Sequence, residues 1–429
     1  MRIVLVESTC SRTFNMGDEA ILAANLALLK RHPEIRSIVL TPNPKTTSLL
    51  HRTETFPSFY SLIKSRNRFL KIIQCLLIAG KLLFNARRIT QGKDPIGLSQ
   101  EERRFLELFA KADAFLIVGS GIIRSSALFF DGNASGLFPK CLEILLAKKL
   151  KKPIFLGAQT IGPFDRSIVG FLSSLFVRFS LKCADFVSVR DYISYSTLRK
   201  WGVYCVLLPD DSFQVSKISQ KKAIQLLKNE GIDLEAIKRE KKFLVGVSFR
   251  AWGNLQKRVK IRLFLERLLE SLATSGNFYF LFIPTMGSWK LPQRMTVAEK
   301  YLLKKLPRNC CGFVKGPYSW REIKAFWSLM DLALVVSFHS GVFAFSSGVP
   351  ALGFYEKKYY QMKLGGLFST MNQRKFLINV NREPLEHAIY KVQRILEEKE
   401  QFKKKICHRA HYLRKRCCLA TRKLLQSLL

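Results

Sequence analysis

The chain has 429 residues, of which 48% are hydrophobic and 24% are charged. This balance indicates a folded globular protein rather than a disordered one, and the length exceeds what one compact core usually holds, so two domains are expected. The 71 Lys and Arg residues outnumber the 32 Asp and Glu residues, which gives a net charge of +39. Such a charge predicts an acidic partner, but phosphorylated small molecules, anionic glycans, anionic membranes and nucleic acid all fit it.

The ten cysteines show no CxxC spacing, which argues against a zinc site or a disulfide framework and predicts reduced thiols in a cytoplasmic protein. Residues Met1–Glu7 form a strand pattern without the features of a signal peptide. The apolar run Ile72–Gly80 is too short to span a bilayer. A basic amphipathic helix over Leu62–Arg88 could lie on an anionic membrane, or could be ordinary core with solvated lysines.

A polar junction follows the first strand and leads into a helix pattern from Asp18 to about Arg31. Gly17 permits a tight turn and the close approach of a ligand. Asp18 could cap the free N–H groups of the helix or act at the substrate, together with Asn15. The junction is therefore a candidate site.

The next strands of the first half also end in small or polar residues, as a parallel α/β domain requires. The strand 114–118 ends in a glycine turn with Gly119 and Gly121, a weak signal for a phosphate or sugar loop. The strand 186–189 ends in Arg190-Asp191. Arg190 could hold an anion, or could form a structural ion pair with Asp191.

The second half begins after a charged, helical segment at 217–242, where the domain boundary is expected. The strand 243–248 places Arg250 just beyond its end, which makes this arginine a second candidate anion ligand. The predicted organisation is an N-terminal domain (1–216), the boundary segment (217–242), a C-terminal domain (243–384) and a basic helical tail (385–429), which could be merely solvated or could dock to an anionic membrane or glycan.

The segment 331–356 reads as a strand, a short helix of small residues and a second strand. Ser337, His339 and Ser340 lie where the first strand passes into the helix. This end of a parallel strand usually faces the ligand, and the N–H groups of the helix start favour an anion. A buried core histidine is the alternative, but the position favours a functional His339.

Six segments in this order resemble the polysaccharide pyruvyl transferase family, whose members move a pyruvyl group from phosphoenolpyruvate to a sugar. They are Asn15–Ala20 (the family's NxGDE signature), Gly119–Gly121, Gly157–Pro163 (ending in Ile-Gly-Pro), Val187–Asp191 with Ser194, Pro209-Asp210, and His339 through Pro350, Tyr355 and Lys357. The resemblance implies an α/β fold of two Rossmann-like domains facing across a cleft, similar to GT-B glycosyltransferases, with the active site in that cleft.

One position departs from the family pattern, because Ser337 stands where an arginine usually precedes the histidine by two residues. That arginine is expected to hold the donor's phosphate or carboxylate. Either Arg250 supplies the charge, with Arg190 as a further anion ligand, or donor use has changed.

The resemblance implies a ketal-forming transferase that acts on a cell-envelope polysaccharide or glycolipid, with phosphoenolpyruvate as donor and no cofactor or metal. His339 would act as acid and base, and Asp18 would orient or deprotonate the acceptor. The expected substrate-binding residues are Asn15, Gly17, Gly119, Gly121, Arg190, Arg250, Ser337 and Ser340.

Two alternatives to this transferase stay open. They are a GT-B glycosyltransferase that uses a nucleotide sugar, and a non-catalytic protein that binds anionic glycan or membrane. Nucleic acid is the least expected partner, because no recognisable binding motif accompanies the charge. The expected location is cytoplasmic, with possible peripheral contact at the inner face of the membrane.

Overall fold

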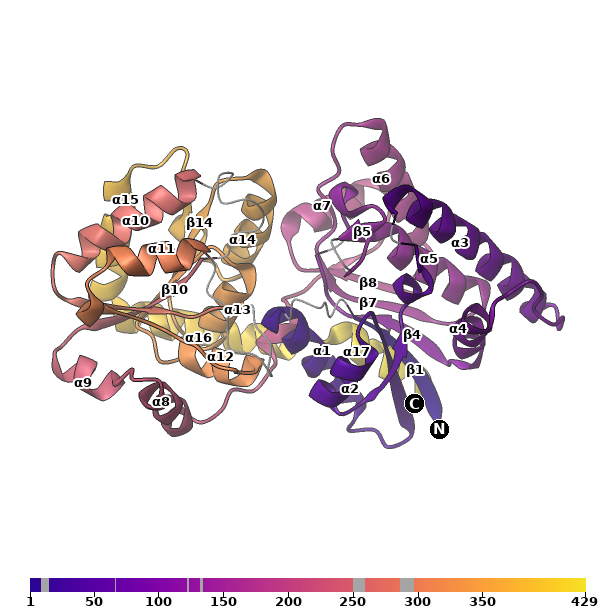
Figure 1. Cartoon of the computed structure of the whole chain (residues 1–429), viewed down its shortest axis with the longest axis horizontal. Helices are drawn as coiled ribbons and strands as arrows, with labels where there is room; N and C mark the ends of the chain where they lie inside the picture. The colour runs from indigo at the N-terminus through magenta and orange to yellow at the C-terminus, as the bar shows by residue number, and fades with distance from the viewer. Residues whose placement is uncertain (9–14, 66, 122, 132–133, 250–258, 286–296) are drawn as a thin grey trace. The chain divides into compact units, whose positions relative to one another are not determined.

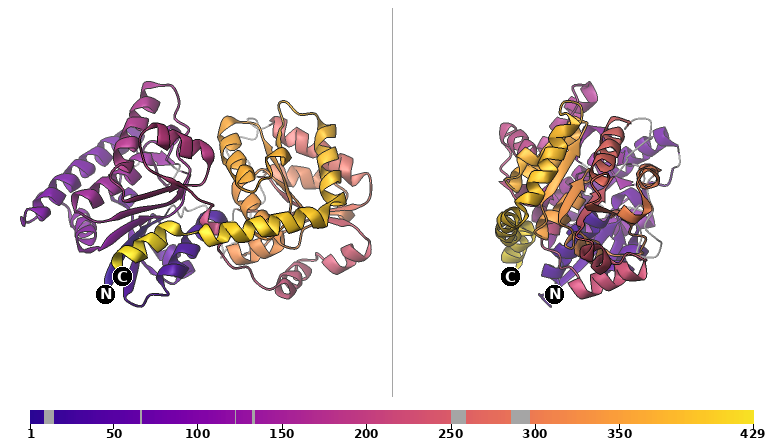
Figure 2. Two further views of the ribbon diagram at one scale, coloured as in Figure 1. Left: turned by 180° about the vertical axis from the view of Figure 1, so that it is seen from behind. Right: turned by 90° about the vertical axis from the view of Figure 1, so that its left-hand side faces the viewer.

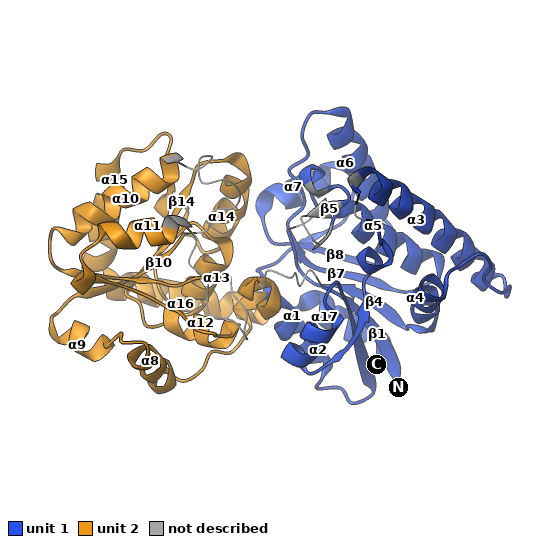
Figure 3. Ribbon diagram, in the orientation of Figure 1, with its two compact units in different colours: residues 1–12, 21–211, 418–429 blue, residues 13–20, 212–417 orange. Residues whose placement is uncertain are grey.

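The computed structural model describes residues 1–8, 15–65, 67–121, 123–131, 134–249, 259–285 and 297–429 (Figure 1). The chain forms two compact units (Figure 3). Unit 1 contains Met1–Arg12, Ile21–Asp211 and Cys418–Leu429, and unit 2 contains Thr13–Ala20 and Ser212–Cys417. Unit 2 therefore includes a short segment from near the N-terminus, Thr13–Ala20, and unit 1 includes the C-terminal segment Cys418–Leu429.

Unit 1 is built on a seven-stranded parallel sheet in the order β3-β2-β1-β4-β7-β8-β9. Its strands are β1 (Arg2–Glu7), β2 (Ile35–Thr41), β3 (Glu54–Pro57), β4 (Ala114–Ile117), β7 (Ile154–Gln159), β8 (Phe186–Val189) and β9 (Val206–Leu207). Most are continuous apolar runs, because helices cover both faces of the sheet. A two-stranded antiparallel hairpin, β5 (Phe130–Asp131) and β6 (Ala134–Ser135), stands apart from it.

Alternate residues of each strand feed two separate apolar cores. Val4 and Val6 of β1 pack with α1 (Met16–Leu29) and α17 (Leu419–Leu428), whereas Leu5 faces the layer that contains α3 (Arg68–Thr90), α5 (Leu137–Lys149) and α6 (Ile168–Leu181). The remaining helices of unit 1 are α2 (Pro44–His51), α4 (Gln100–Lys111) and α7 (Tyr192–Lys200). Because α17 ends the chain beside this sheet, both termini lie close together (Figure 2).

Unit 2 repeats the arrangement with a six-stranded parallel sheet in the order β12-β11-β10-β13-β14-β15. Its strands are β10 (Phe243–Ser248), β11 (Phe278–Phe282), β12 (Cys311–Phe313), β13 (Leu332–Val335), β14 (Ala351–Tyr355) and β15 (Leu377–Asn379). Its helices are α8 (Gln220–Asn229), α9 (Leu234–Arg239), α10 (Val259–Ala273), α11 (Val297–Lys305), α12 (Trp320–Trp327), α13 (Phe338–Ser346), α14 (Lys358–Thr370), α15 (Leu385–Glu397) and α16 (Lys399–Arg416). Each unit is thus a Rossmann-like domain.

The units differ from the predicted domains at the charged segment 217–242 and at the basic tail. The charged segment 217–242 forms α8 and α9 of unit 2, because each helix buries apolar residues despite its charge. The predicted basic tail also divides. α16 buries Phe402, Ile406, Ala410 and Leu413 and packs on α13, whereas α17 packs on the sheet of unit 1. The basic residues of α16 are the outer face of an amphipathic helix.

The strand order reverses next to the first strand of each sheet, between β1 and β4 and between β10 and β13. Ligands of open α/β sheets bind beyond the carboxyl ends of the strands at such a point. The ligand position expected in each unit therefore lies at the ends of β1 and β4 or of β10 and β13.

Candidate functional site

The carboxyl end of β13 carries the first group of candidate residues. Ser337 precedes the first turn of α13 in an extended conformation, and His339 and Ser340 lie inside that turn. All three side chains are buried, and His339 is 4% exposed. α13 ends at Ser346, and Gly348 follows two residues later with a φ of +84° that suits glycine. The missing side chain of Gly348 leaves room for Cys407 of α16. α16 therefore packs closely against the C-terminal end of α13.

The start of α1 packs directly on His339 within unit 2. A Cβ atom added to Gly17 would lie 1.9 Å from Cγ and 2.0 Å from Nδ1 of His339, so the imidazole fills the space of the missing side chain. The predicted candidates Gly17 and His339 are thus brought into contact, although they lie 322 positions apart in the sequence.

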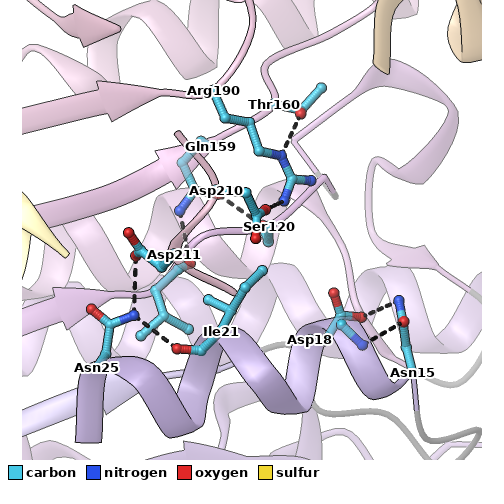
Figure 4. A network of polar contacts seen from close by, with 12 residues as sticks. Asn15, Asp18, Ile21, Asn25, Ser120, Gln159, Thr160, Arg190, Asp210 and Asp211 are labelled. Carbon is cyan, nitrogen blue, oxygen red and sulfur yellow. Dashed lines mark hydrogen bonds and ion pairs between the residues drawn. The ribbon is translucent and has the colours of Figure 1, made fainter. Parts of the chain in front are cut away.

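Asn15 and Asp18 hold the first turn of α1 in place (Figure 4). The side-chain oxygen of Asn15 accepts a hydrogen bond from the backbone N–H of Gly17 at 3.1 Å. Its amide nitrogen donates to the carboxylate of Asp18 at 2.8 Å. The side chain of Asn15 therefore caps a backbone N–H group of the first turn, and Asp18 is half-buried beside it.

Hydroxyl groups line the neighbouring strand ends of unit 2. Ser340 donates a hydrogen bond to the hydroxyl of Ser248, which ends β10, at 2.7 Å. The hydroxyls of Ser337 and Thr285 lie 3.3 Å apart, and the carbonyl of Thr285 accepts the N–H of Met16 at 3.0 Å. Thr285 and Ser248 were not predicted as site residues, because a lone hydroxyl after a strand carries no recognisable motif.

Two helix N-termini, those of α1 and α13, meet at His339. The partial positive charge of a helix N-terminus favours an anion. No group of three or more His, Cys, Asp or Glu side chains is placed to hold a metal ion in the part of the chain that the structure describes. The predicted anion ligand Arg250 lies outside the described residues.

The glycine turn after β4 forms a second group in unit 1. A Cβ atom on Gly119 would lie 2.8 Å from the carbonyl oxygen of Ala158, so glycine is needed where the ends of β4 and β7 come close. The carbonyl of Gly121 accepts a hydrogen bond from Arg124 at 2.8 Å. The packing of two strands explains Gly119, and ligand binding by Gly119 and Gly121 stays a prediction.

Arg190 lies in a buried network beyond β8 (Figure 4). Its guanidinium contacts Asp210 at 2.5 Å and donates to the hydroxyl of Thr160 at 2.9 Å. The Arg190 and Asp210 side chains are each 1% exposed. The sequence suggested that Arg190 could pair with Asp191. In the structure Arg190 instead forms an ion pair with Asp210.

The neighbouring Asp191 caps α7 instead. Its carboxylate accepts hydrogen bonds from the N–H and the hydroxyl of Ser194, each at 2.7 Å, and the Ser194 hydroxyl in turn accepts the N–H of Ile161. The segment from Val187 to Ser194 thus ties α7 to the end of β7. The motif formed by Val187–Asp191 and Ser194 therefore has a structural role in unit 1.

Replacing Arg190 by methionine should destabilise unit 1 by about 3–5 kcal/mol, because the buried carboxylate of Asp210 would lose its cation. Denaturant unfolding followed by tryptophan fluorescence measures this. Arg36→Met is the matched control, since Arg36 makes a comparable contact with Glu54 at 2.8 Å on the surface. The control should leave the unfolding midpoint nearly unchanged. An equal effect of the two substitutions would contradict the structural role of Arg190.

Asp211 joins the C-terminal helix to unit 1. Its carboxylate accepts hydrogen bonds from the side-chain amide of Asn25 at 3.0 Å and from the N–H of Cys418 at 2.6 Å. Burial raises the pKa of Asp211 from 3.8 to about 6. The folded protein therefore binds this proton more tightly than the unfolded chain does.

Unit 1 should accordingly lose stability as the pH rises from about 4 to 6, by an amount on the order of 2–3 kcal/mol from Asp211. Asp211→Asn removes the titrating group but keeps one oxygen acceptor. The free energy of unfolding of the variant minus that of the natural protein should increase over this pH range and level off above it. A difference that does not vary with pH would show that Asp211 has an ordinary pKa.

The chain is similar to one known protein family and to several solved structures. The polysaccharide pyruvyl transferase family matches residues 15–358. No curated protein matches the sequence significantly. Similar solved structures include a glycosyltransferase from Rickettsia africae ESF-5, with 12% identity, a TM-score of 0.59, and coverage of 99% of this chain and 97% of that chain.

Two further structures are similar over most of their length. A UDP-GlcNAc 2-epimerase from Neisseria meningitidis, bound to UDP-GlcNAc, has 11% identity, a TM-score of 0.57 and coverage of 100% of this chain and 99% of that chain. A UDP-GlcNAc 2-epimerase from Methanocaldococcus jannaschii has 12% identity, a TM-score of 0.54 and coverage of 92% and 93%. At such low identity these similarities establish the GT-B-like fold alone.

Proposed function

Since the chain belongs to the polysaccharide pyruvyl transferase family, we propose that it transfers the pyruvyl group of phosphoenolpyruvate to a sugar of a cell-envelope polysaccharide or glycolipid. The product is a pyruvate ketal. The observation that supports this most is the contact of His339 with the first turn of α1, at the meeting of two helix N-termini. A proton-transfer group thereby lies beside an environment that favours an anion.

The reaction requires a proton donor, a base and stabilisation of negative charge. Two sugar hydroxyls form bonds to the central carbon of the donor, and the bond from that carbon to the phosphate oxygen breaks. The methylene carbon gains one proton and becomes a methyl group. The two hydroxyl protons balance this gain and the protonation of the departing phosphate, so no oxidant, reductant or cofactor takes part.

The residues of unit 2 take distinct roles in this proposal. His339 moves the proton between the sugar hydroxyl and the donor, and Asp18 orients or deprotonates the acceptor while Asn15 holds its carboxylate. The α1 and α13 N-termini, with the hydroxyls of Ser337 and Thr285, would face the donor's oxygens. Neutral hydroxyls thus occupy the neighbourhood in which the family arginine is expected, and donor affinity should be correspondingly lower.

Phosphate release from phosphoenolpyruvate in the presence of candidate envelope glycans tests the proposal, and NMR detects the new ketal methyl group. Release that depends on the glycan supports it. No release with any acceptor, together with tight binding of a nucleotide sugar, would contradict it and favour a glycosyltransferase. Glycan binding without turnover of either donor would favour the non-catalytic alternative.

A further inference from the structure

Two helices of unit 1, α3 and α6, are apolar on both of their faces. Both pack against α5, which is itself almost wholly buried, and both therefore belong to the same layer over the sheet (Figure 1). A helix that is apolar all round is normally covered on all sides, either by protein or by lipid. Among the residues that the structure describes, those of unit 1 cover one face of α3 and one face of α6 and leave the other exposed.

The buried face of α3 carries Cys75, Ile78, Ala79, Leu82 and Ala86, at the spacing of one helix face. Its other face exposes six large apolar side chains, and Phe69 is 70% exposed. These six are Phe69, Leu70, Ile73, Leu76, Leu77 and Phe84. The solvent-facing stripe therefore extends along most of the helix.

The exposed face of α6 has the same character. Val177 and Leu181 point into the core, whereas Phe171 and Phe179 are 61% and 62% exposed. The exposed apolar residues of this helix are Ile168, Val169, Phe171, Leu172, Leu175 and Phe179. We refer to these six and the six exposed residues of α3 as the α3–α6 surface. The exposed apolar side chains along each helix exceed the scattered apolar residues that are normal on a soluble protein.

The charges on these helices are all of one sign. Neither α3 nor α6 contains an Asp or a Glu, whereas α3 contains Arg68, Lys71, Lys81, Arg87 and Arg88 and α6 contains Arg178. The side chains of Arg87 and Arg178 are exposed. Large apolar side chains bordered by cations match an anionic bilayer, in which acyl chains lie beneath negatively charged headgroups.

We propose that the α3–α6 surface docks unit 1 on an anionic membrane, with both helices lying in the plane of the interface. α3 is long and apolar enough to span a bilayer by composition. Spanning would withdraw its buried face from the unit 1 core, so the geometry favours a surface position. The inference does not depend on the proposed reaction, although it would place a lipid-linked glycan acceptor near the enzyme.

Vesicle flotation with the full-length protein tests the inference. The protein should bind phosphatidylcholine vesicles that contain phosphatidylglycerol, bind pure phosphatidylcholine more weakly, and release as the salt concentration rises. Leu77→Ser with Phe171→Ser should weaken binding at least about tenfold, because both side chains would enter the acyl region. Arg87→Gln with Arg178→Gln should remove most of the preference for the anionic lipid.

The matched control is Tyr204→Ser with Tyr390→Ser, since these tyrosines are 74% and 57% exposed and lie outside both helices. It should bind vesicles like the natural protein, and circular dichroism should be unchanged in every variant. Absence of binding to anionic vesicles would overturn the inference. Equal binding by the apolar variant and the control would also overturn it, as would self-association that the apolar variant abolishes while vesicle binding is unaffected.

Discussion

His339→Ala should reduce glycan-dependent phosphate release by about 10²–10⁴-fold, because general acid–base catalysis typically contributes that much. The imidazole lies at the start of α13 and against the first turn of α1, where the donor would bind. Steady-state measurement of kcat and KM for phosphoenolpyruvate tests this. The loss should lie mainly in kcat, since the proton is transferred in the transition state.

His51→Ala is the matched control, because His51 is also a buried histidine but lies at the end of α2 in unit 1. Its activity should stay within a few-fold of that of the natural protein. His339→Asn would keep a polar group of similar size and should not restore turnover. Activity of His339→Ala close to that of the natural protein would remove His339 from the mechanism, even if the pyruvyl transfer itself were demonstrated.

Gly17→Ala should reduce activity by at least about 100-fold without removing any functional group. The added methyl group would lie 1.9 Å from Cγ of His339, so the imidazole or the first turn of α1 must move. A displacement of about 1 Å at a reacting group can reduce the rate by about 10²-fold. Kinetic measurement together with thermal unfolding separates a misplaced imidazole from a loss of folding.

Gly80→Ala provides the control for this substitution. Gly80 also lies within a helix, and a Cβ atom there would meet nothing within 4 Å. Alanine should therefore stabilise α3, by up to about 1 kcal/mol, and leave activity unchanged. If Gly17→Ala were as harmless as Gly80→Ala, the close packing of α1 on His339 would be wrong.

Much of the fold could be predicted from apolar runs. The strands 186–189 and 243–248 were predicted with the observed bounds, because buried parallel strands are nearly continuous in hydrophobicity. The short edge strands β3 and β15 were not predicted, since one partner strand and partial exposure leave little pattern to read. The weak periodicity of α3 has a different origin, because both of its faces are apolar.

The site was predictable only where a residue stood at a strand end within a recognisable motif. His339, Ser337 and Ser340 lie at the end of β13 as expected, and the Asn15–Ala20 junction begins α1. The sequence left two roles open for Arg190, the binding of an anion and a structural ion pair. Its partner Asp210 lies 20 residues away in the sequence. The sequence offers many carboxylates that could pair with Arg190. Only the packed structure shows which of them is buried away from water beside it.

The amino-acid sequence by itself determined the two parallel α/β halves, the family and the strand-end position of His339, because hydrophobic period and turn residues act locally. Only the tertiary structure decided which segments pack together. It assigned residues 13–20 to unit 2 and 418–429 to unit 1, placed Gly17 against His339, and buried Arg190 with Asp210. The physical reason is that these contacts join residues far apart in sequence, and their complementarity of shape and charge exists only once the core has formed.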